Sequence, residues 1–246
     1  MVDSALTNLT KKHLQNRQNM THLDTELLKL KQQLFEMWSL TISQVESARE
    51  ALLNFDKGVA AEISFRERMV DTYELKLDRD CENIIALFNP VATDLRLTLA
   101  VFKINSDLER IGDFANGIAK FVKKFPKEQL NPEILTICQL DDMLKNAIEM
   151  LTDAKKALEH ENSRMALSIF SHDDFLDDLH KGSTKIIADY IRKHPTEIEE
   201  ALNLHNIISK IERIGDHCSN IAEEIVFYLE AKVLKHSGKI KNIDEK

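Results

Sequence analysis

A pentapeptide that occurs twice provides the clearest chemical signal in this chain. Glu-Arg-Ile-Gly-Asp occupies residues 109–113 and recurs at residues 212–216. Residues four apart lie on the same face of a helix, so each copy places two carboxylates in one stripe. Like charges at this spacing destabilise a helix by roughly 0.2–0.5 kcal/mol unless a cation neutralises them. The repeated spacing therefore indicates a cation-binding site in each half of the chain.

The glycine inside each copy strengthens this interpretation. Gly112 and Gly215 each cost about 1 kcal/mol relative to Ala in a helix interior. The same cost at equivalent positions indicates close approach of another segment or space kept for a ligand. Acidic pairs are also common on solvated helix faces, where Arg110 and Arg213 would simply pair with them. The duplication of the whole phrase favours a metal over this alternative.

Further acidic residues lie on the helix that precedes each copy. Glu67, Asp71, Glu74 and Asp78 advance by four, three and four residues, which puts them on one face. By itself the Glu67–Asp71 pair is typical of a solvated surface, but an antiparallel neighbour brings this stripe against the repeated phrase. The predicted metal ligands are Glu67, Asp71, Glu74, Glu109 and Asp113 in the first site and Asp173, Asp177, His180, Glu212 and Asp216 in the second.

The ligand types limit which metals are expected. Carboxylates suit Mg²⁺, Mn²⁺, Ca²⁺ or iron, and His180 adds zinc for the second site. Carboxylates that bridge can hold more than one ion, so each site is expected to be multinuclear. Asn105, Asn116 and Asn220 extend the stripes, whereas His217 points about 100° away from its neighbour Asp216.

No arrangement typical of an enzyme accompanies these stripes. The sequence lacks a glycine-rich phosphate loop, a nucleophile elbow and any Ser/His/Asp spacing that proposes a triad. Asp177-x-x-His180 matches the Glu-x-x-His motif of ferritin-like di-iron bundles once and imperfectly. We therefore expect a protein that is not an enzyme. Two alternatives stay open: a metal-storage or metal-handling bundle and, less favoured, a hydrolase in which bridged cations activate water.

Composition places the chain among helical proteins. Its 246 residues include only 6 Gly and 4 Pro, which disfavours an all-β fold. A net charge of -8 argues against nucleic-acid binding, which needs a basic surface. The 3 Cys are expected to be small core residues in a reducing compartment. No apolar run resembles a secretory signal or a transmembrane segment, so we expect a cytoplasmic protein that is at most peripheral to a membrane.

Apolar residues at three- and four-residue steps predict six long helices. All 4 prolines fall at predicted helix ends, and Asp56 is a predicted N-cap. Similarity between the halves indicates an all-α fold, a tandem duplication of two three-helix bundles with antiparallel neighbours. The predicted helices are residues 22–54, 56–88, 90–124, 132–159, 162–193 and 196–235. The predicted domains are a polar segment at 1–20, repeats at 21–125 and 131–235, and a polar tail at 236–246.

Longer stretches around the repeated phrase carry a family resemblance. They are residues 90–96 (PVATDLR) with 107–113 (DLERIGD), and residues 211–217 (IERIGDH) with 220–223 (NIAE). In this order they resemble the first-half and second-half signatures of the PhoU family of phosphate-signalling proteins. The resemblance covers about residues 20–230 and implies a duplicated three-helix fold with multinuclear clusters of iron or zinc. The implied ligand pairs are Glu67/Asp71, Glu109/Asp113, Asp173/Asp177 and Glu212/Asp216.

The resemblance also implies a regulator rather than a catalyst. It implies an adaptor between the ATPase of the phosphate ABC transporter and the sensor histidine kinase of the phosphate two-component system. Such an adaptor restrains phosphate uptake and phosphate-starvation signalling when phosphate is plentiful. We further expect a homodimer, because long helical bundles with exposed seams often pair.

The two halves are not identical. His180 stands where the first half has Glu74, and Gly117 stands where the second half has Asn220. The two sites are therefore expected to differ in the number or identity of their metals. Arg96, in the first signature, is expected either to pair with a neighbouring carboxylate or to contact a partner.

Overall fold

The structure is a computed structural model, and it describes residues 21–127 and 129–234. This part of the chain is helical and contains no strand, which confirms the all-α prediction. The elements are α2 (His22–Asn54), α3 (Lys57–Phe88), α4 (Ala92–Lys124), α5 (Pro132–Ile137), α6 (Leu140–Glu159), α7 (Ser163–Lys193), the 3₁₀ turn η1 (Pro195–Glu197) and α8 (Ile198–Glu230).

Side-chain caps determine where the first helices begin. Thr21 and Asp24 form a reciprocal capping box at the start of α2, which pairs backbone N–H groups that have no partner within the helix. The carboxylate of Asp56 accepts hydrogen bonds from the N–H groups of Gly58 (2.8 Å) and Val59 (3.0 Å), which confirms the predicted N-cap of α3. A cap of this kind stabilises a helix by about 1 kcal/mol.

The predicted helix at 132–159 is wrong as a single element. α5 ends at Ile137 and α6 begins at Leu140. Between them Gln139 has a φ of 51°, a left-handed conformation that interrupts a right-handed helix. Ile134 and Leu140 are nevertheless both fully buried in the same core, so hydrophobic spacing continues across the break and does not reveal it.

The last predicted helix is shorter than expected. Its predicted first residues, 196 and 197, belong to the 3₁₀ turn η1, and α8 ends at Glu230 instead of residue 235. Ala231 ends α8 with a φ of 56°, and its N–H donates to the carbonyl of Phe227. Residues 231–234, which follow, are not helical, and Leu234 packs against the core.

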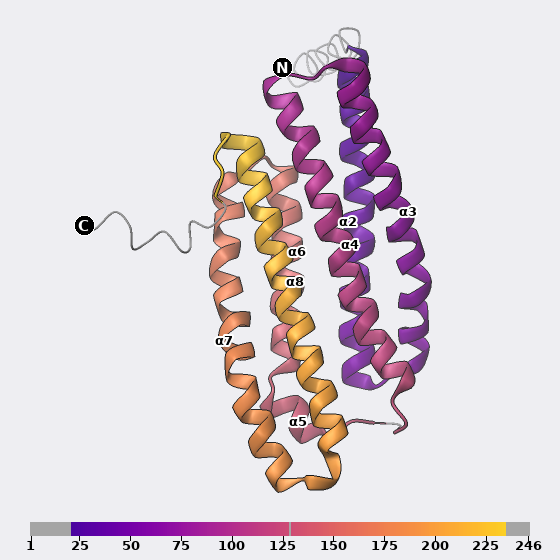
Figure 1. Ribbon diagram of the computed structural model, residues 1–246, viewed down its shortest axis with the longest axis vertical. Coiled ribbons are helices and arrows are strands. Elements are labelled where there is room, and N and C mark those ends of the chain that lie inside the picture. The colour runs from indigo at the N-terminus through magenta and orange to yellow at the C-terminus, as the bar shows by residue number, and fades with distance from the viewer. Residues whose placement is uncertain (1–20, 128, 235–246) are drawn as a thin grey trace, which may run out of the picture.

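Two three-helix bundles lie side by side, and their long helices run roughly along the long axis of the molecule (Figure 1). α2, α3 and α4 pack against one another, and so do α6, α7 and α8. The bundles meet along α4 and α8, with a second contact between α2 and α6. Short corners make consecutive helices antiparallel. As a result α3 lies beside α4, and α7 lies beside α8, and these are the helix pairs that carry the acidic stripes.

Buried polar contacts join the two bundles. Trp38 is fully buried and donates its Nε1–H to the backbone carbonyl of Leu151 at 3.0 Å. Lys103 Nζ lies 2.9 Å from both carboxylate oxygens of Glu224, whose side chain is 7% exposed. These contacts set the position of one bundle against the other.

Expectations about single side chains have different outcomes. Cys81, Cys138 and Cys218 are free and buried, as expected for small core residues. Arg96 donates its Nε–H to the backbone carbonyl of Tyr228 at 3.2 Å, so the expected pairing with a carboxylate is wrong. The two bundles meet at this point, and the Tyr228 carbonyl of α8 therefore lies closer to the Arg96 guanidinium than the acidic side chains of α4 do.

Among the described helices, none is both long enough and apolar enough to cross a membrane. The division into repeats at 21–125 and 131–235 stays a prediction. The predicted polar segments at 1–20 and 236–246 lie outside the described residues.

Candidate metal centres

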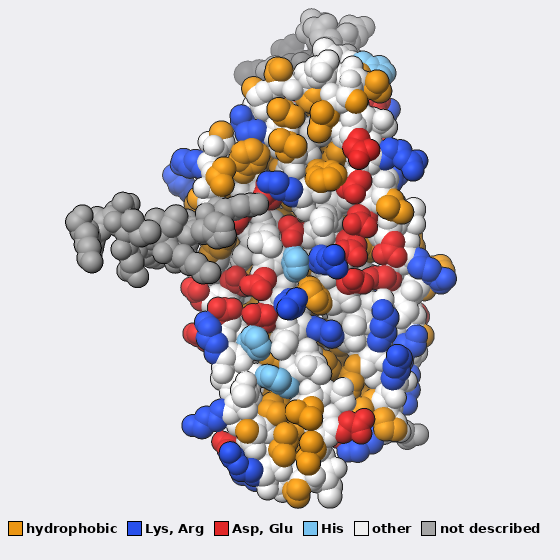
Figure 2. Space-filling view, in the orientation of Figure 1, with side chains coloured by type: hydrophobic (Ala, Val, Ile, Leu, Met, Phe, Trp, Pro, Cys, Tyr) orange, Lys and Arg blue, Asp and Glu red, His pale blue; other side chains and the backbone are white. Residues whose placement is uncertain are grey.

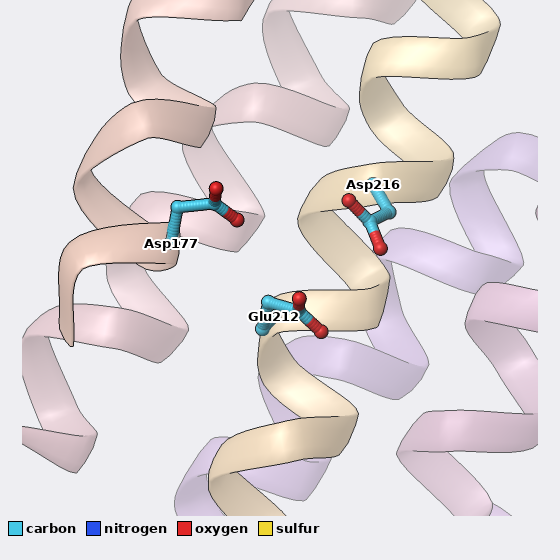
Figure 3. Close-up of side chains that lie close together, drawn as sticks. All are labelled: Asp177, Glu212 and Asp216. Carbon is cyan, nitrogen blue, oxygen red and sulfur yellow. The ribbon is translucent and has the colours of Figure 1, made fainter. Parts of the chain in front are cut away.

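Three carboxylates of the second half converge between α7 and α8. Asp177 extends from α7 towards α8, where Glu212 and Asp216 project from successive turns (Figure 3). One oxygen of each carboxylate lies within 4.8 Å of an oxygen of the other two. This is the convergence that the helical spacing of the acidic residues predicts.

Asp173 lies one turn before Asp177 on α7 and faces the same part of α8. Ser219 donates its hydroxyl to Asp173 Oδ2 at 2.8 Å. The other oxygen, Oδ1, is buried and accepts no hydrogen bond from any described residue. A Cβ on Gly215 would lie only 2.7 Å from this Oδ1. Gly215 therefore provides the space in which the Asp173 carboxylate lies.

His180 lies at the edge of the second site. Its Nδ1 is 3.4 Å from Glu212 Oε1, and its Nε2 is 3.1 Å from Ser209 Oγ. Lys181 Nζ lies 2.9 Å from Asp177 Oδ2. Among the predicted ligands, His180 therefore contacts Glu212, and Lys181 pairs with Asp177.

The first site is built around a buried glutamate. Glu67 is 6% exposed, and Gln44 of α2 donates its Nε2–H to Glu67 Oε2 at 2.7 Å. Glu67 Oε1 is buried and accepts no hydrogen bond within the described part of the chain. A Cβ on Gly112 would lie 3.3 Å from Glu67 Oε2 and 3.0 Å from Gln44 Oε1. The solvated-surface alternative is therefore wrong for Glu67, and Gly112 leaves room for both side chains.

Asp71 of α3 and Asp113 of α4 lie near Glu67, and Glu74 and Glu109 lie near these two carboxylates. Asp113 lies close enough to Glu67 for a hydrogen bond when one of the two carries a proton. The exposed Arg110 approaches Glu109 at 3.6 Å and Asp113 at 3.9 Å. Exposed pairs at these distances stabilise a protein by less than about 1 kcal/mol, so Arg110 does not neutralise the site.

Burial and mutual repulsion raise the pKa values of several acidic groups in the two sites. Burial is the larger cause for Glu67, whose pKa rises to about 8, and for Asp173, whose pKa rises to about 6. Burial and then repulsion between carboxylates also raise the pKa values of Glu74, Glu109, Glu212 and Asp216. Burial and repulsion therefore make the ionised form of these carboxyl groups costly, and a bound cation would relieve this cost.

The donor sets fit a metal ion. Each site offers carboxylates from two helices, and each contains one buried carboxylate oxygen that lacks a hydrogen-bond donor among the described residues. Oxygen donors match Mg²⁺, Mn²⁺, Ca²⁺ or iron, and His180 makes zinc suitable for the second site. Among the described residues, oxygens of Asp177, Glu212 and Asp216 lie within 4.8 Å of one another, a spacing at which carboxylates can share more than one ion. The identification of these residues as metal ligands stays a prediction.

Other polar residues of the stripes have different partners. His217 Nδ1 lies 2.7 Å from Asp107 Oδ1 on α4, in keeping with its expected direction away from Asp216. Asn220 also donates to Asp107, at 3.5 Å, so it joins the bundles instead of extending the second site. Asn105 donates to Asp78 Oδ1 at 2.9 Å. The amides therefore connect helices around the sites.

Two residues that hydrogen-bond the acidic groups, Gln44 and Ser219, were not predicted from the sequence. Gln44 belongs to α2, outside both acidic stripes, and Ser219 follows the second phrase by one turn. A signal existed in each case. Gln44 occupies a buried position between Thr41 and Ala48 in a largely apolar seam, and a buried amide needs a polar partner. Ser219 lies three residues after Asp216, which keeps it on the acidic face of α8.

The fold and the two sites define a class of all-α proteins built by duplication of an acidic three-helix unit. Both units carry acidic residues on the second and third long helices, and in the second unit Asp177, Glu212 and Asp216 converge. The model of the PhoU domain family matches residues 34–122 and 140–225, one match in each bundle. The chain belongs to the PhoU family.

Relatives and solved structures agree with this assignment. A "phosphate-specific transport system accessory protein PhoU homolog" of Pseudomonas putida is 29% identical and covers 91% of this chain and 88% of that relative. The PhoU accessory protein of Escherichia coli is 29% identical, with 87% and 88% covered. The crystal structure of PhoU from Pseudomonas aeruginosa has a TM-score of 0.82 at 28% identity and covers 86% of this chain and 100% of that one. The phosphate transport system regulatory protein PhoU from Streptococcus pneumoniae has a TM-score of 0.76 at 29% identity, with 86% and 99% covered.

Proposed function

We propose that this protein is a cytoplasmic, metal-containing regulator that restrains phosphate uptake and phosphate-starvation signalling when phosphate is plentiful. Its similar relatives are named accessory or regulatory proteins of phosphate transport. The partners in this proposal are the ATPase of the phosphate ABC transporter and the sensor histidine kinase of the phosphate two-component system. The protein acts by contact and not by catalysis.

The observation that carries this proposal is the pair of acidic sites at equivalent places in the two bundles. In each site a glycine of the repeated phrase makes room for a carboxylate of the neighbouring helix, Glu67 beside Gly112 and Asp173 beside Gly215. Bound cations would neutralise these carboxylates and hold α3 against α4, and α7 against α8. Their role is therefore to stabilise the surfaces that meet the partners.

Exposed apolar side chains support a role in protein contacts. Phe65, Leu75 and Leu87 project from α3 and are 61%, 66% and 72% exposed. α3 lies on the side of its bundle away from α8, where it is free of the contact between the bundles (Figure 1). A homodimer or a complex with a transporter subunit would cover such side chains.

A genetic experiment in the producing organism tests the regulatory role. Deletion of the gene is expected to raise the expression of a phosphate-starvation reporter in phosphate-rich medium, and the wild-type gene is expected to restore repression. A variant that combines Glu109→Ala, Asp113→Ala, Glu212→Ala and Asp216→Ala is expected to restore less repression, because both sites lose ligands. Asp178→Ala, at an exposed position beside the second site, is the matched control.

The possible results separate the two parts of the proposal. Unchanged repression after deletion would contradict the regulatory role. Full repression by the fourfold variant would show that the protein regulates without its acidic sites. Co-purification with the transporter ATPase and with the sensor kinase tests the partners.

A further inference from the structure

We propose that the cleft between the second half of α4 and the first half of α8 binds a nucleotide. The cleft opens between the two bundles and has a volume of about 560 Å³. Small-molecule sites typically measure about 300–1,000 Å³, so a nucleotide fits this space. Nothing in this proposal depends on the acidic sites or on the regulatory role.

Positive charge dominates the cleft. Lys120 and Lys124 line it from α4, Lys210 and Arg213 line it from α8, and Glu199 is the one carboxylate in the lining. None of the four cations forms an ion pair with another described residue. On the face made by α4 and α8, basic side chains lie between and below two groups of acidic ones (Figure 2). In a chain with a net charge of -8, such a concentration of cations in a concave surface attracts anions.

A glycine allows one of these cations to lie across the opposite helix. A Cβ on Gly117 would lie 3.1 Å from Lys210 Cε and 3.4 Å from Lys210 Nζ. A larger residue at this position of α4 would push the lysine away. The equivalent position of the second half is Asn220, so this glycine is not part of the duplicated pattern. Gly117 therefore helps to hold the Lys210 ammonium group in the cleft.

The rest of the lining indicates the class of anion. Phosphate groups are bound by the forked guanidinium of arginine and by the point charges of lysines. Phe114 and Phe121 are half-buried and line the same cleft, where they offer flat apolar surfaces for a base. Asn203, Asn206 and Ser209 add hydrogen-bonding groups. An inorganic anion would leave the aromatic part unused, whereas a nucleotide uses both parts.

Calorimetric titration of the full chain with ATP, adenosine and inorganic phosphate tests the proposal. ATP is expected to bind both with and without EDTA, and adenosine and phosphate are each expected to bind at least about tenfold more weakly. Lys210→Gln is expected to weaken ATP binding about tenfold, because it removes one charge-assisted contact. The double variant Lys120→Gln/Lys124→Gln is expected to weaken it at least as much. Lys123→Gln, on the exposed side of α4 outside the cleft, is the matched control and is expected to bind ATP as the wild type does.

Several results would overturn the proposal. One is the absence of ATP binding at millimolar concentrations, and another is equal loss of affinity in Lys123→Gln and Lys210→Gln. If adenosine or inorganic phosphate bound as tightly as ATP, the aromatic and the cationic parts of the cleft would not act together on one ligand, and the proposal would be wrong. ATP binding that disappears in EDTA and survives Lys210→Gln would place the nucleotide on a metal at the acidic sites. Circular dichroism establishes that each variant is folded.

Discussion

Asp173 Oδ1 lies 2.7 Å from the point where a Cβ of residue 215 would be. The backbone of α8 therefore forms one wall of the space that holds this carboxylate. Glu67 has the same relationship to Gly112, at 3.3 Å from its Oε2. In both bundles the glycine of the repeated phrase thus serves the packing of an acidic side chain from the neighbouring helix.

Replacing Gly215 tests this packing. In Gly215→Ala the new methyl group would meet Asp173 Oδ1 and, at 2.6 Å, Leu176 Cδ1. We expect a net loss of about 1–3 kcal/mol in the free energy of unfolding, although alanine favours a helix. Gly182→Ala in α7 is the matched control, because no atom lies within 4 Å of its added Cβ. This control is expected to stabilise the protein by about 1 kcal/mol. Urea denaturation followed by circular dichroism measures both, and a gain in Gly215→Ala would show that the space is not needed.

The stability of the metal-free protein is expected to fall as pH rises. Burial and the nearby Asp113 raise the pKa of Glu67 from its ordinary value of 4.5 to about 8 in the folded protein. The folded state therefore holds this proton more tightly than the unfolded state does. The resulting stability is fully present below about pH 4.5 and is lost as pH rises through about 8. Asp173, whose pKa rises to about 6, adds a loss of the same sign at lower pH.

Thermal melts in EDTA between these pH values measure this dependence. Glu67→Gln is the matched variant, since glutamine has the shape of glutamic acid and does not ionise. Its melting temperature is expected to exceed that of the wild type at pH 8 and to depend less on pH. Equal pH dependence in both proteins would show that Glu67 does not carry the effect.

The two acidic sites are expected to lose metal independently. Glu109→Ala/Asp113→Ala removes ligands of the first site and leaves the second, and Asp177→Ala/Asp216→Ala does the reverse. Elemental analysis of purified protein is expected to show a small fixed number of ions per chain, reduced in each double variant, with helicity retained. Asp178→Ala, whose side chain is 83% exposed, is expected to keep all of them. Wild-type metal content in either double variant would rule out that site, and many loosely held ions would favour storage.

The contact between the bundles depends on a buried charge. Lys103→Met leaves Glu224, with its 7% exposed side chain, without its cation. We expect a loss of about 2 kcal/mol in the free energy of unfolding, because an unpaired buried carboxylate is poorly solvated. Lys103→Met/Glu224→Leu is expected to recover most of this loss. A double variant whose loss equals the sum of the two single losses would show that the residues do not interact.

Local patterns were sufficient for most of the long helices, although not for the break between α5 and α6, and they determine which acidic residues share a helix face. The spacing of apolar residues predicts the long helices because it depends only on the pitch of a helix and on the presence of a core. The same pitch places Glu109 with Asp113, and Glu212 with Asp216, whatever surrounds them. The cost of a glycine in a helix also marked Gly112 and Gly215 as positions of close approach.

Only the tertiary structure decided which of these groups are buried and what they contact. Glu67 resembles a surface residue within α3, and it is the approach of Gln44 from α2 and of α4 that removes it from water. Asp107 is joined to His217, and Gly117 to Lys210, by the packing of α4 against α8. Burial, pKa and clefts depend on segments that are distant in the sequence, whereas a helical stripe depends on residues within a few turns of one another.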